Sequence, residues 1–377
     1  MMRLYPSDKR LDGMYSLLLA VLLCSSPLLG VALLDRPIDQ YLEFPPTTRY
    51  VAHAPFSWMF FWLLLLLVFL VCLPFLYRFA SYRPALETTQ KKTYPFPWWG
   101  WLGVFLILAT WVLAWNRFQF FKEMQRFTFF PIWLGYILAV NGLTCRRQRS
   151  CLLLSRSRFF LALFPLSGLF WWYFEYLNRF VQNWHYLGNG TISAPEYIIH
   201  ASICFSTVLP AVLSTHELLA TSVRLNSAFS GWHRFISPGK KGVGLFLLAG
   251  SLLSLSLLAV FPDYLFPLVW ISPLLVIVGL QLATGQSTLF SELEQGNWRH
   301  IVLPALAALI CGFFWEMWNW KSLAHWQYSV PFVHRYQVFA MPFLGYAGYL
   351  PFGLECMAVA ALLEKMKVFA EGNKTGR

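Results

Sequence analysis

The sequence has few charged residues and lacks the common nucleotide-binding and nucleophile motifs. Only 12% of its 377 residues are charged, about half of the roughly 25% that is typical of soluble domains. It contains no G-x-x-x-x-G-K-[ST] loop, no G-x-G-x-x-G, no G-x-S-x-G and no aspartate-rich pair that would hold a diphosphate through magnesium. These absences argue against ATP-driven transport by this chain alone and against prenyl-diphosphate transfer.

Cysteine and histidine also lack the spacing of a metal or redox site. The seven Cys residues include no C-x-x-C pair, and five of them lie in apolar runs: Cys24, Cys72, Cys204, Cys311 and Cys356. His216-Glu217 begins an H-E-x-x-H pattern, but Ala220 stands where the second His is required. We therefore predict no metal and no cofactor. His200 and His325 are expected near the outer ends of their segments, either as structural residues or as residues that bind ligand or move protons.

The residues that are abundant are apolar and aromatic. Hydrophobic residues make up 58% of the chain and aromatic residues 19%, with 18 Trp. Trp and Tyr collect at the two interfaces of a membrane, where their amphipathic rings suit the head-group region. The net charge of +12 comes from basic residues scattered between apolar runs, which does not indicate nucleic-acid binding. The composition predicts an integral membrane protein.

The hydropathy pattern predicts an all-α bundle of about ten transmembrane helices, because a span needs about 20 mainly apolar residues. The expected spans are 14–34, 56–77, 97–116, 127–145, 159–178, 197–217, 242–261, 264–285, 300–318 and 338–363. A short turn at Phe261-Pro262-Asp263 is expected to separate the seventh span from the eighth.

The distribution of basic residues predicts an orientation. If the N-terminus is inside, the inner segments carry 21 Lys and Arg and the outer loops carry 8, as expected because cytoplasmic loops are enriched in these residues. Both termini are therefore expected in the cytoplasm, and the plasma membrane of a bacterium is the expected location. The first apolar run is too long for a secretory signal and is expected to remain as a helix.

Comparison of the chain with itself predicts an internal duplication at an offset of about 141 residues. Residues 174–178 (FEYLN) match 315–319 (WEMWN), and each segment is followed by a Trp-x-Tyr sequence. Gly103 pairs with Gly244, and Pro210 with Pro351. The predicted organisation is a cytoplasmic tail plus two helices at 1–96, a first four-helix repeat at 97–222, a second at 240–366, and a cytoplasmic tail at 367–377. Four is an even number, so the repeats are expected to be parallel.

Each predicted repeat carries the same polar and aromatic motif near the outer end of a helix. Its residues are Glu175, Asn178, Trp184 and Tyr186 in the first repeat and Glu316, Asn319, Trp326 and Tyr328 in the second. One interpretation is structural: Glu and Asn fix the helix end, and the rings anchor the loop at the interface. The other is a ligand-binding cup, polar and lined with aromatic rings, for a head group, a sugar or an apolar molecule.

Glu355 is predicted near the middle of the bilayer, after a stretch from 336 to 354 without charge. An ionisable residue there costs about 2.5 kcal/mol or more on insertion scales and is a functional hypothesis by default. It is our candidate proton donor, and Glu316 is a further candidate. The alternative is a protonated Glu355 bonded to a carbonyl that Pro351 leaves free.

The sequence of Trp326, Tyr328, Pro351 and Glu355 resembles the membrane-bound lycopene cyclase domain, whose small helical repeats carry a Pro-x-Glu-Glu element. The resemblance covers the last two helices of each repeat. It differs in the spacing of Pro351 and Glu355, in the absence of the second Glu and in the number of helices per repeat. It implies an isoprenoid-type lipid, with Glu355 donating a proton to an apolar polyene in an aromatic cavity and no change of redox state.

Three functions follow as hypotheses. The first is binding or redox-neutral modification of an apolar isoprenoid-type lipid in an intramembrane cavity. The second is a proton-coupled or passive transporter or channel with Glu355 as the proton or ion site. The third is a non-catalytic subunit that binds a partner membrane protein or a pigment. The expected partner is thus a membrane lipid or apolar small molecule, with no nucleic acid. The sequence does not define whether the chain is an enzyme or how it oligomerises.

Overall fold

A computed structural model describes residues 13–46, 48–83, 93–188, 190, 192–236 and 239–366. The two tails expected at the ends lie outside these residues, except for 13 at the start of the first helix. Among the described residues, seven helices are long and apolar enough to cross a membrane, or up to nine if each of two bent helix pairs counts as one span. The chain thus has the helical, lipid-compatible architecture that its composition predicts.

The longer helices are α1 (Gly13–Leu33), α3 (Trp58–Ser81), α4 (Trp98–Trp115), α5 (Phe129–Gln148), α7 (Ser157–Val181), α8 (Ala194–Phe205), α9 (Val208–Ala220), α11 (Lys240–Leu257), α13 (Ser272–Ala283), α14 (Arg299–Trp320) and α15 (Tyr349–Glu364). Short helices are α2 (Asp39–Leu42), α6 (Leu152–Ser155), α10 (Val223–Phe229) and α12 (Pro262–Leu265), with 3-10 turns η1 (Gln119–Phe127), η2 (Phe266–Trp270), η3 (Ser291–Gln295) and η4 (Phe343–Gly348). Four short strands form two ribbons: β1 (Trp184–Leu187) with β2 (His325–Tyr328), and β3 (Gln337–Val338) with β4 (Met341–Pro342).

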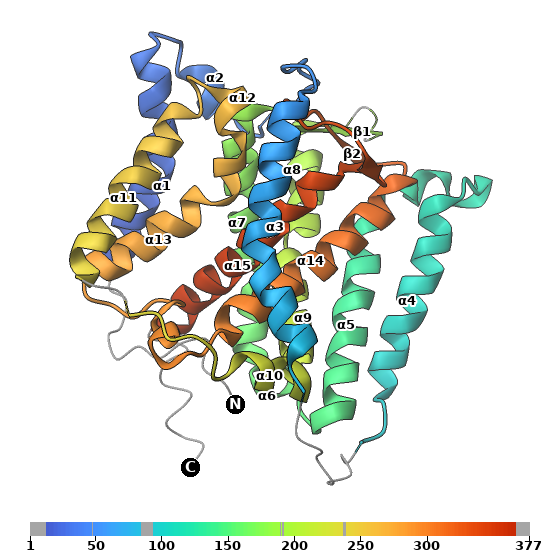
Figure 1. Cartoon of the computed structure of the whole chain (residues 1–377). Coiled ribbons are helices and arrows are strands. Elements are labelled where there is room, and N and C mark those ends of the chain that lie inside the picture. Colours follow the sequence, from blue (N-terminus) through green and yellow to red (C-terminus); the bar gives the residue numbers. More distant parts are fainter. Residues whose placement is uncertain are drawn as a thin grey trace.

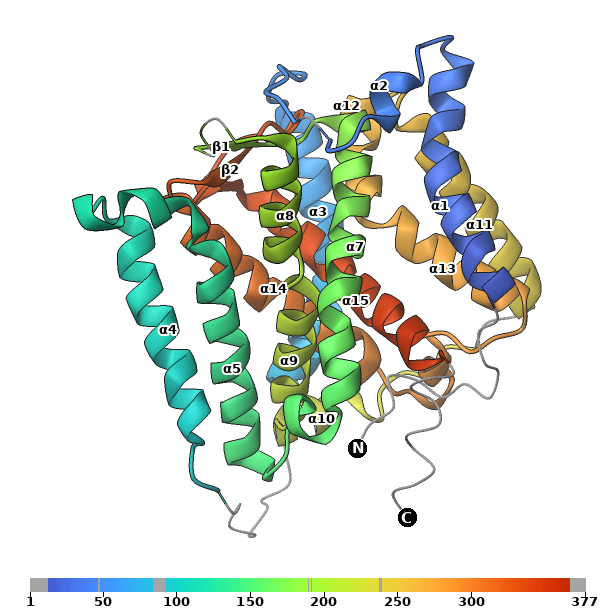
Figure 2. The ribbon, with the colours of Figure 1, turned by 180° about the vertical axis from the view of Figure 1, so that it is seen from behind.

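Two helix pairs flank a central group of helices (Figures 1 and 2). The pair α4 and α5 lies at one edge, and the pair α11 and α13, with α1 packed against it, lies at the other. Between them α14 packs against α9 and α15, while α7 packs against α8 and α9. The β1–β2 ribbon covers one end of this central group.

The elements follow one another in a similar order in 97–222 (the first segment) and 240–366 (the second segment). In each, a short helical segment is followed by a longer helix that points in a different direction. The bend is 70° between η1 and α5, and 57° between Pro262–Trp270 and α13. A long helix and a strand come next, α7 and β1 in the first segment and α14 and β2 in the second. Each segment then ends on a helix, α9 or α15, that packs on its own long helix.

Within each flanking pair, the two helices cross at a glycine, and these glycines occupy matching positions in the two pairs. A Cβ added at Gly103 would lie 2.6 Å from the Ala139 nitrogen and 2.7 Å from the Gly135 oxygen. At Gly244 it would lie 2.6 Å from the Ala283 nitrogen, with a second glycine oxygen at 2.9 Å. Such distances exclude any side chain, so small residues are what permit the backbones to approach this closely, as is common between helices in membranes.

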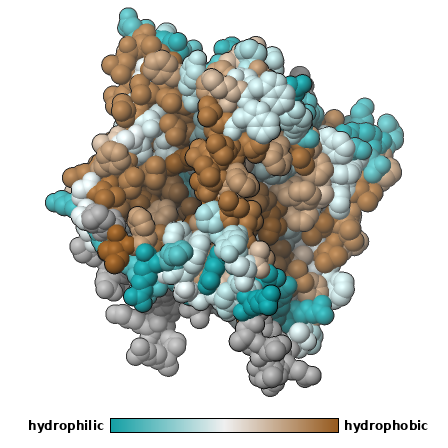
Figure 3. All heavy atoms as spheres, in the orientation of Figure 1, coloured by the Kyte–Doolittle hydropathy of each residue, from teal (hydrophilic) through white to brown (hydrophobic). Residues whose placement is uncertain are grey.

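Helix α3 lies across the front of the central group and exposes most of its apolar surface (Figure 1). Only 6% of the most apolar 18-residue stretch of α3 is buried in the protein. Hydrophobic side chains dominate the middle of the same face, while hydrophilic ones gather at its upper and lower ends (Figure 3). Contiguous exposed apolar surface of this extent is what a lipid environment requires.

Three expected spans differ in detail from the structure. The span expected at 264–285 is interrupted by η2, because Pro262, Pro267 and Pro273 lack the N–H that a continuous helix needs. The span expected at 197–217 breaks between α8 and α9. The span expected from 338 begins only at Phe343, because residues 337–342 form the β3–β4 ribbon.

Candidate functional site

The two Trp-x-Tyr sequences pair with each other as the antiparallel strands β1 and β2. Trp184 lies opposite Tyr328, His185 opposite Gln327, and Tyr186 opposite Trp326. This register is unchanged when the two strands are exchanged. The ribbon therefore has a local two-fold axis that passes through the pair of His185 and Gln327.

Asn178 and Asn319 fix the strands to the ends of their long helices. The Asn178 amide donates to the Trp184 carbonyl at 2.8 Å, and its oxygen accepts from the Asn183 N–H at 2.8 Å. The Asn319 amide likewise donates to the Trp326 carbonyl and its oxygen accepts from the Trp326 N–H, both at 2.8 Å. Each Asn thus satisfies backbone groups where the chain leaves its helix.

The carboxyl group of Glu175 holds the first set of rings. Its Oε1 accepts hydrogen bonds from the Trp171 indole at 3.0 Å, the Trp184 indole at 3.1 Å and the Tyr186 hydroxyl at 2.5 Å. Glu175 is buried, and its Oε2 has no hydrogen-bond partner among the described residues. Three donors that converge on one oxygen fix the orientation of three rings.

The carboxyl group of Glu316 holds the second set in the same way. Its Oε1 accepts from the Tyr328 and Tyr349 hydroxyls, each at 2.7 Å. The Trp326 indole joins this network by donating to the Tyr328 oxygen at 2.7 Å. Within the described residues Oε2 is again buried without a partner. Both carboxyl groups therefore organise rings through a single oxygen.

Each carboxyl group also accepts from one donor outside the ribbon, and this donor comes from different helices in the two segments. Gly312 stands where Trp171 stands in the first segment, and Tyr349 stands where Val208 does, at the offset of 141. The ring of Tyr349 occupies the space over Gly312, since a Cβ there would meet it at 2.4 Å. A large residue on one helix is thus exchanged for a large residue on the other, and a donor reaches the carboxyl group in both cases.

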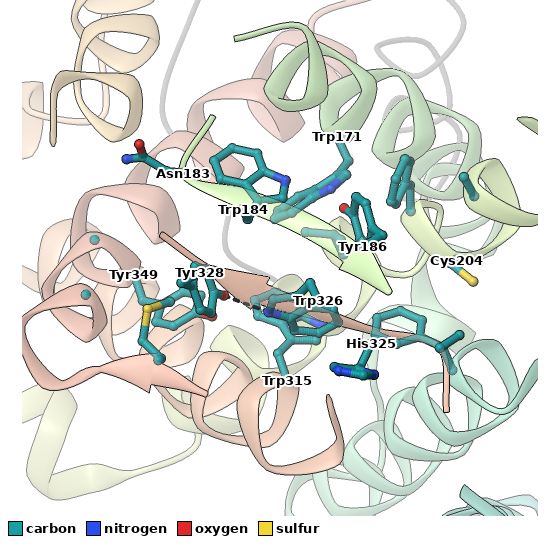
Figure 4. Close-up of a pocket in the computed structure, with 18 of the residues that line it drawn as sticks. Trp171, Asn183, Trp184, Tyr186, Cys204, Trp315, His325, Trp326, Tyr328 and Tyr349 are labelled. Atoms are coloured by element: carbon teal, nitrogen blue, oxygen red, sulfur yellow. Dashed lines mark hydrogen bonds between the residues drawn. The ribbon is translucent and has the colours of Figure 1, made fainter. Parts of the chain in front are cut away.

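The rings line a cavity of about 160 Å³ beneath the β1–β2 ribbon, and this cavity is partly open to the outside. The rings of Trp171, Trp184 and Tyr186 gather beside β1, and those of Trp326, Tyr328 and Tyr349 beside β2 (Figure 4). Twelve lining residues come from 126–208 and twelve from 266–349. The size of the cavity is similar to that of cavities that accept one benzene ring.

Many lining positions match between the two segments. At an offset of 141 or 142 residues the lining set contains seven pairs: Phe129 and Trp270, Asn183 and His325, Trp184 and Trp326, Tyr186 and Tyr328, His200 and Met341, Cys204 and Gly345, and Val208 and Tyr349. The contacts across the cavity match as well. Phe129 packs edge-on against Trp326 with ring centroids 5.9 Å apart, and Trp270 packs against Trp184 at 5.7 Å. The cavity therefore straddles the local two-fold axis.

The four ring residues expected in the motif, Trp184, Tyr186, Trp326 and Tyr328, line the cavity. The four polar residues Glu175, Asn178, Glu316 and Asn319 do not, and they lie behind the rings that they hold. The cavity wall itself is thus mostly apolar and aromatic. Among the described residues, no three His, Cys, Asp or Glu side chains gather closely enough to hold a metal ion.

Sequence reasoning missed other lining residues, including Trp171, Trp270, Trp315 and Tyr349. Trp171 carried a signal, because it lies one helical turn before Glu175 on the same face. Tyr349 did not, since only the packing of α15 on α14 brings its hydroxyl to Glu316.

Glu355 does not line the cavity. It lies on α15, about 9 Å along the helix axis from Tyr349, and Phe352 lies between the two in the sequence. The Phe352 ring is buried among Phe170, Phe174, Trp171, Trp270 and Trp315. The Oε2 atom of Glu355 is buried with no partner among the described residues. The candidate proton donor is therefore separated from the cavity by a layer of aromatic rings.

A segment before α3, residues 48–57, covers the outer face of the ribbon. Tyr50 packs edge-on against His185, with centroids 5.8 Å apart, and Ser329 donates to the Val51 carbonyl at 2.6 Å. His185 is buried, and its Nδ1 has no partner among the described residues. Burial, with a smaller contribution from nearby His325, lowers the pKa of His185 below its ordinary value. The imidazole is thus held neutral within the ribbon.

Comparison with known proteins finds no matching family model, no matching curated protein and no matching solved structure. The function must therefore be argued from this site alone.

Proposed function

We propose that the chain is a ten-span membrane protein with both termini in the cytoplasm and two parallel four-helix repeats. Support comes from helical segments at all ten expected positions, including α7, whose 25 residues extend about 37 Å. The glycine crossings, the exchange-symmetric ribbon and the shared cavity lining match at closely similar offsets, between 141 and 144 residues. In this orientation the ribbon and the cavity lie at the outer side of the membrane.

We propose that the protein binds an apolar lipid of isoprenoid type, part of which lies in this partly open cavity. The observation that carries the proposal is the aromatic cavity at the two-fold axis, to which residues 126–208 and 266–349 contribute twelve residues each. Aromatic faces bind flat unsaturated groups by stacking and edge contacts, and ligand sites between parallel halves are common in duplicated membrane proteins. The carboxyl groups act here by fixing the rings.

Identification of the co-purifying lipid tests this proposal. The purified protein is extracted with organic solvent, and the extract is analysed by mass spectrometry beside that of Gly348→Phe. A Cβ at Gly348 meets only the Trp270 ring, at 3.6 Å or more, so the larger ring is expected to enter the cavity. Gly250→Phe on α11 is the matched control, because nothing lies within 4 Å of that position.

We expect one apolar species, enriched over bulk membrane lipid, in the wild type and in Gly250→Phe and depleted in Gly348→Phe. An extract of bulk phospholipid alone in all three proteins would contradict the proposal.

A second candidate function, proton-coupled transport, rests on Glu355, whose Oε2 is buried with no hydrogen-bond partner among the described residues. A buried ionisable group in a membrane helix often belongs to a proton pathway. In proteoliposomes with an internal pH dye, Glu355→Gln is expected to abolish a proton flux that the wild type carries. Glu364→Gln is the control, because Glu364 forms a 2.8 Å ion pair with Arg156 at the end of the same helix. Equal flux in the wild type, Glu355→Gln and empty liposomes would exclude this function.

A further inference from the structure

The lining of the cavity differs in polarity between its two sides. On the side of η2, β4 and η4 it consists of Phe266, Met341, Gly345 and other apolar residues. On the side of η1 and α8 it includes Arg126, Tyr197 and His200. Positions that match in the two repeats have thus diverged, since His200 corresponds to Met341 in the second one. An occupant with one polar end and one apolar end fits this difference.

Arg126 is a cation that forms no ion pair with an acidic side chain in the described part of the chain. Among the described residues it makes no ion pair or hydrogen bond, and its Nε is buried and unpartnered. Its guanidinium lies over the Phe127 ring, 4.8 Å from the centroid, and the His200 ring packs edge-on against the same ring at 5.0 Å. Phe127 thus holds a guanidinium and an imidazole close together at the polar side of the cavity.

The nearby acid is already engaged elsewhere. Glu196 on α8 is close enough to interact electrostatically with Arg126. Its Oε2, however, accepts from the Ser193 N–H at 2.9 Å and from the Ser193 hydroxyl at 3.0 Å, in the capping box that begins α8. The Tyr197 hydroxyl, one residue on, makes no hydrogen bond within the described residues. Hydrogen-bond donors therefore outnumber free acceptors at this side of the cavity among the described residues.

We infer that Arg126, Tyr197 and His200 bind the anionic head group, a phosphate or a carboxylate, of a lipid whose apolar chain lies beneath the β1–β2 ribbon. This inference rests on the proposed lipid-binding function and specifies the class of lipid. A guanidinium suits such a head group because it donates two parallel hydrogen bonds to a planar or tetrahedral oxyanion. The apolar side of the cavity accommodates the chain.

The test compares three probes on the full-length protein in detergent: farnesyl monophosphate, farnesol and inorganic phosphate. Binding is measured with radiolabelled probe for the wild type, Arg126→Gln, Arg126→Lys, Tyr197→Phe and the control Lys122→Gln, which changes an exposed residue of the same 3-10 segment. We expect the wild type and the control to bind farnesyl monophosphate about tenfold or more tightly than farnesol. Arg126→Gln should lose that advantage and still bind farnesol, Arg126→Lys should keep part of it, and Tyr197→Phe should reduce it.

Two results would overturn the head-group inference while lipid binding stands. In the first, Gly348→Phe abolishes farnesol binding, but Arg126→Gln and Tyr197→Phe both still prefer farnesyl monophosphate over farnesol as strongly as the wild type does. The other is inorganic phosphate that binds as tightly as farnesyl monophosphate, which would define a site for the free ion. Failure of both isoprenoids to bind the wild type would instead overturn the proposed function.

Discussion

At the scale of single residues, the carboxyl groups of Glu175 and Glu316 shape the cavity without lining it. Each collects indole or phenol donors on one oxygen, and those rings form the wall. A buried donor that loses its acceptor costs about 1–3 kcal/mol. The two carboxyl groups should therefore contribute to stability and to ligand binding together.

Replacement of Glu175 by Leu leaves three donors without an acceptor. We expect Glu175→Leu to lower the stability of the protein by about 3 kcal/mol or more, with a clear fall in the thermal midpoint in detergent. Glu175→Gln keeps an acceptor oxygen and should lie close to the wild type. Equal midpoints for Leu and Gln would show that the carboxyl group does not hold the rings.

The neutral state of His185 predicts a pH dependence. Its pKa is lower in the folded protein than the ordinary value of 6.5, so the unfolded chain binds more protons below about pH 7. Stability should be constant at higher pH and should fall as the pH decreases through 6.5 toward the lowered value. His325 and Tyr50 face the same ring and remain in place in His185→Gln. We expect a flatter curve of thermal midpoint against pH for this variant, and parallel curves would contradict the assignment.

The sequence identified the repeated motif but not every partner within it. Glu175 and Trp184 were visible because the same residues recur at an offset of about 141 residues. The roles were not visible, because a Glu near a helix end is compatible with a ligand site and with a structural bond alike. Tyr349 could not be recognised because the corresponding residue in the first segment is Val208. Only the packing of the helices places the Tyr349 ring over Gly312, where its hydroxyl reaches Glu316.

At the scale of elements, the sequence predicted helices more readily than strands. Long apolar runs are a strong signal for spans, whereas β1 and β2 have four residues each and are stabilised by pairing with a distant partner. Neither could be recognised from local pattern. The broken helices near α13 and α15 were also misplaced, because Pro and Gly indicate a break without fixing its residue.

The glycine crossings are a prediction at the same scale. Gly103→Leu should force α4 away from α5, since even a Cβ there would lie 2.6 Å from a backbone nitrogen. We expect a loss of about 1–3 kcal/mol or more in stability, measured as a lower thermal midpoint and a smaller monodisperse fraction in size-exclusion chromatography. Gly250→Leu, in open surroundings, should behave like the wild type. No difference between the two variants would exclude the close crossing.

At the scale of the whole molecule, the start of α1 and the end of α15 lie toward the same end, opposite the β1–β2 ribbon (Figures 1 and 2). The proposed orientation places that end in the cytoplasm. The basic residues of the sequence predict this orientation. They do not predict that residues 126–208 and 266–349 meet at a cavity, because that depends on how twelve residues from each range pack.

Labelling with a membrane-impermeant maleimide tests this orientation. Lys321→Cys, exposed at the end of α14 near β2, should react in intact cells more than the unsubstituted chain does. Arg224→Cys, exposed on α10, should react only after permeabilisation. The reverse pattern would require the cavity to lie on the cytoplasmic side.

The most direct test of the central claim is an electron cryo-microscopy map of the protein purified in mild detergent. We predict elongated density beneath the β1–β2 ribbon, in contact with Trp184 and Trp326, that disappears in Gly348→Phe. A wild-type map in which these rings close on each other, with no density between the two repeats, would contradict it.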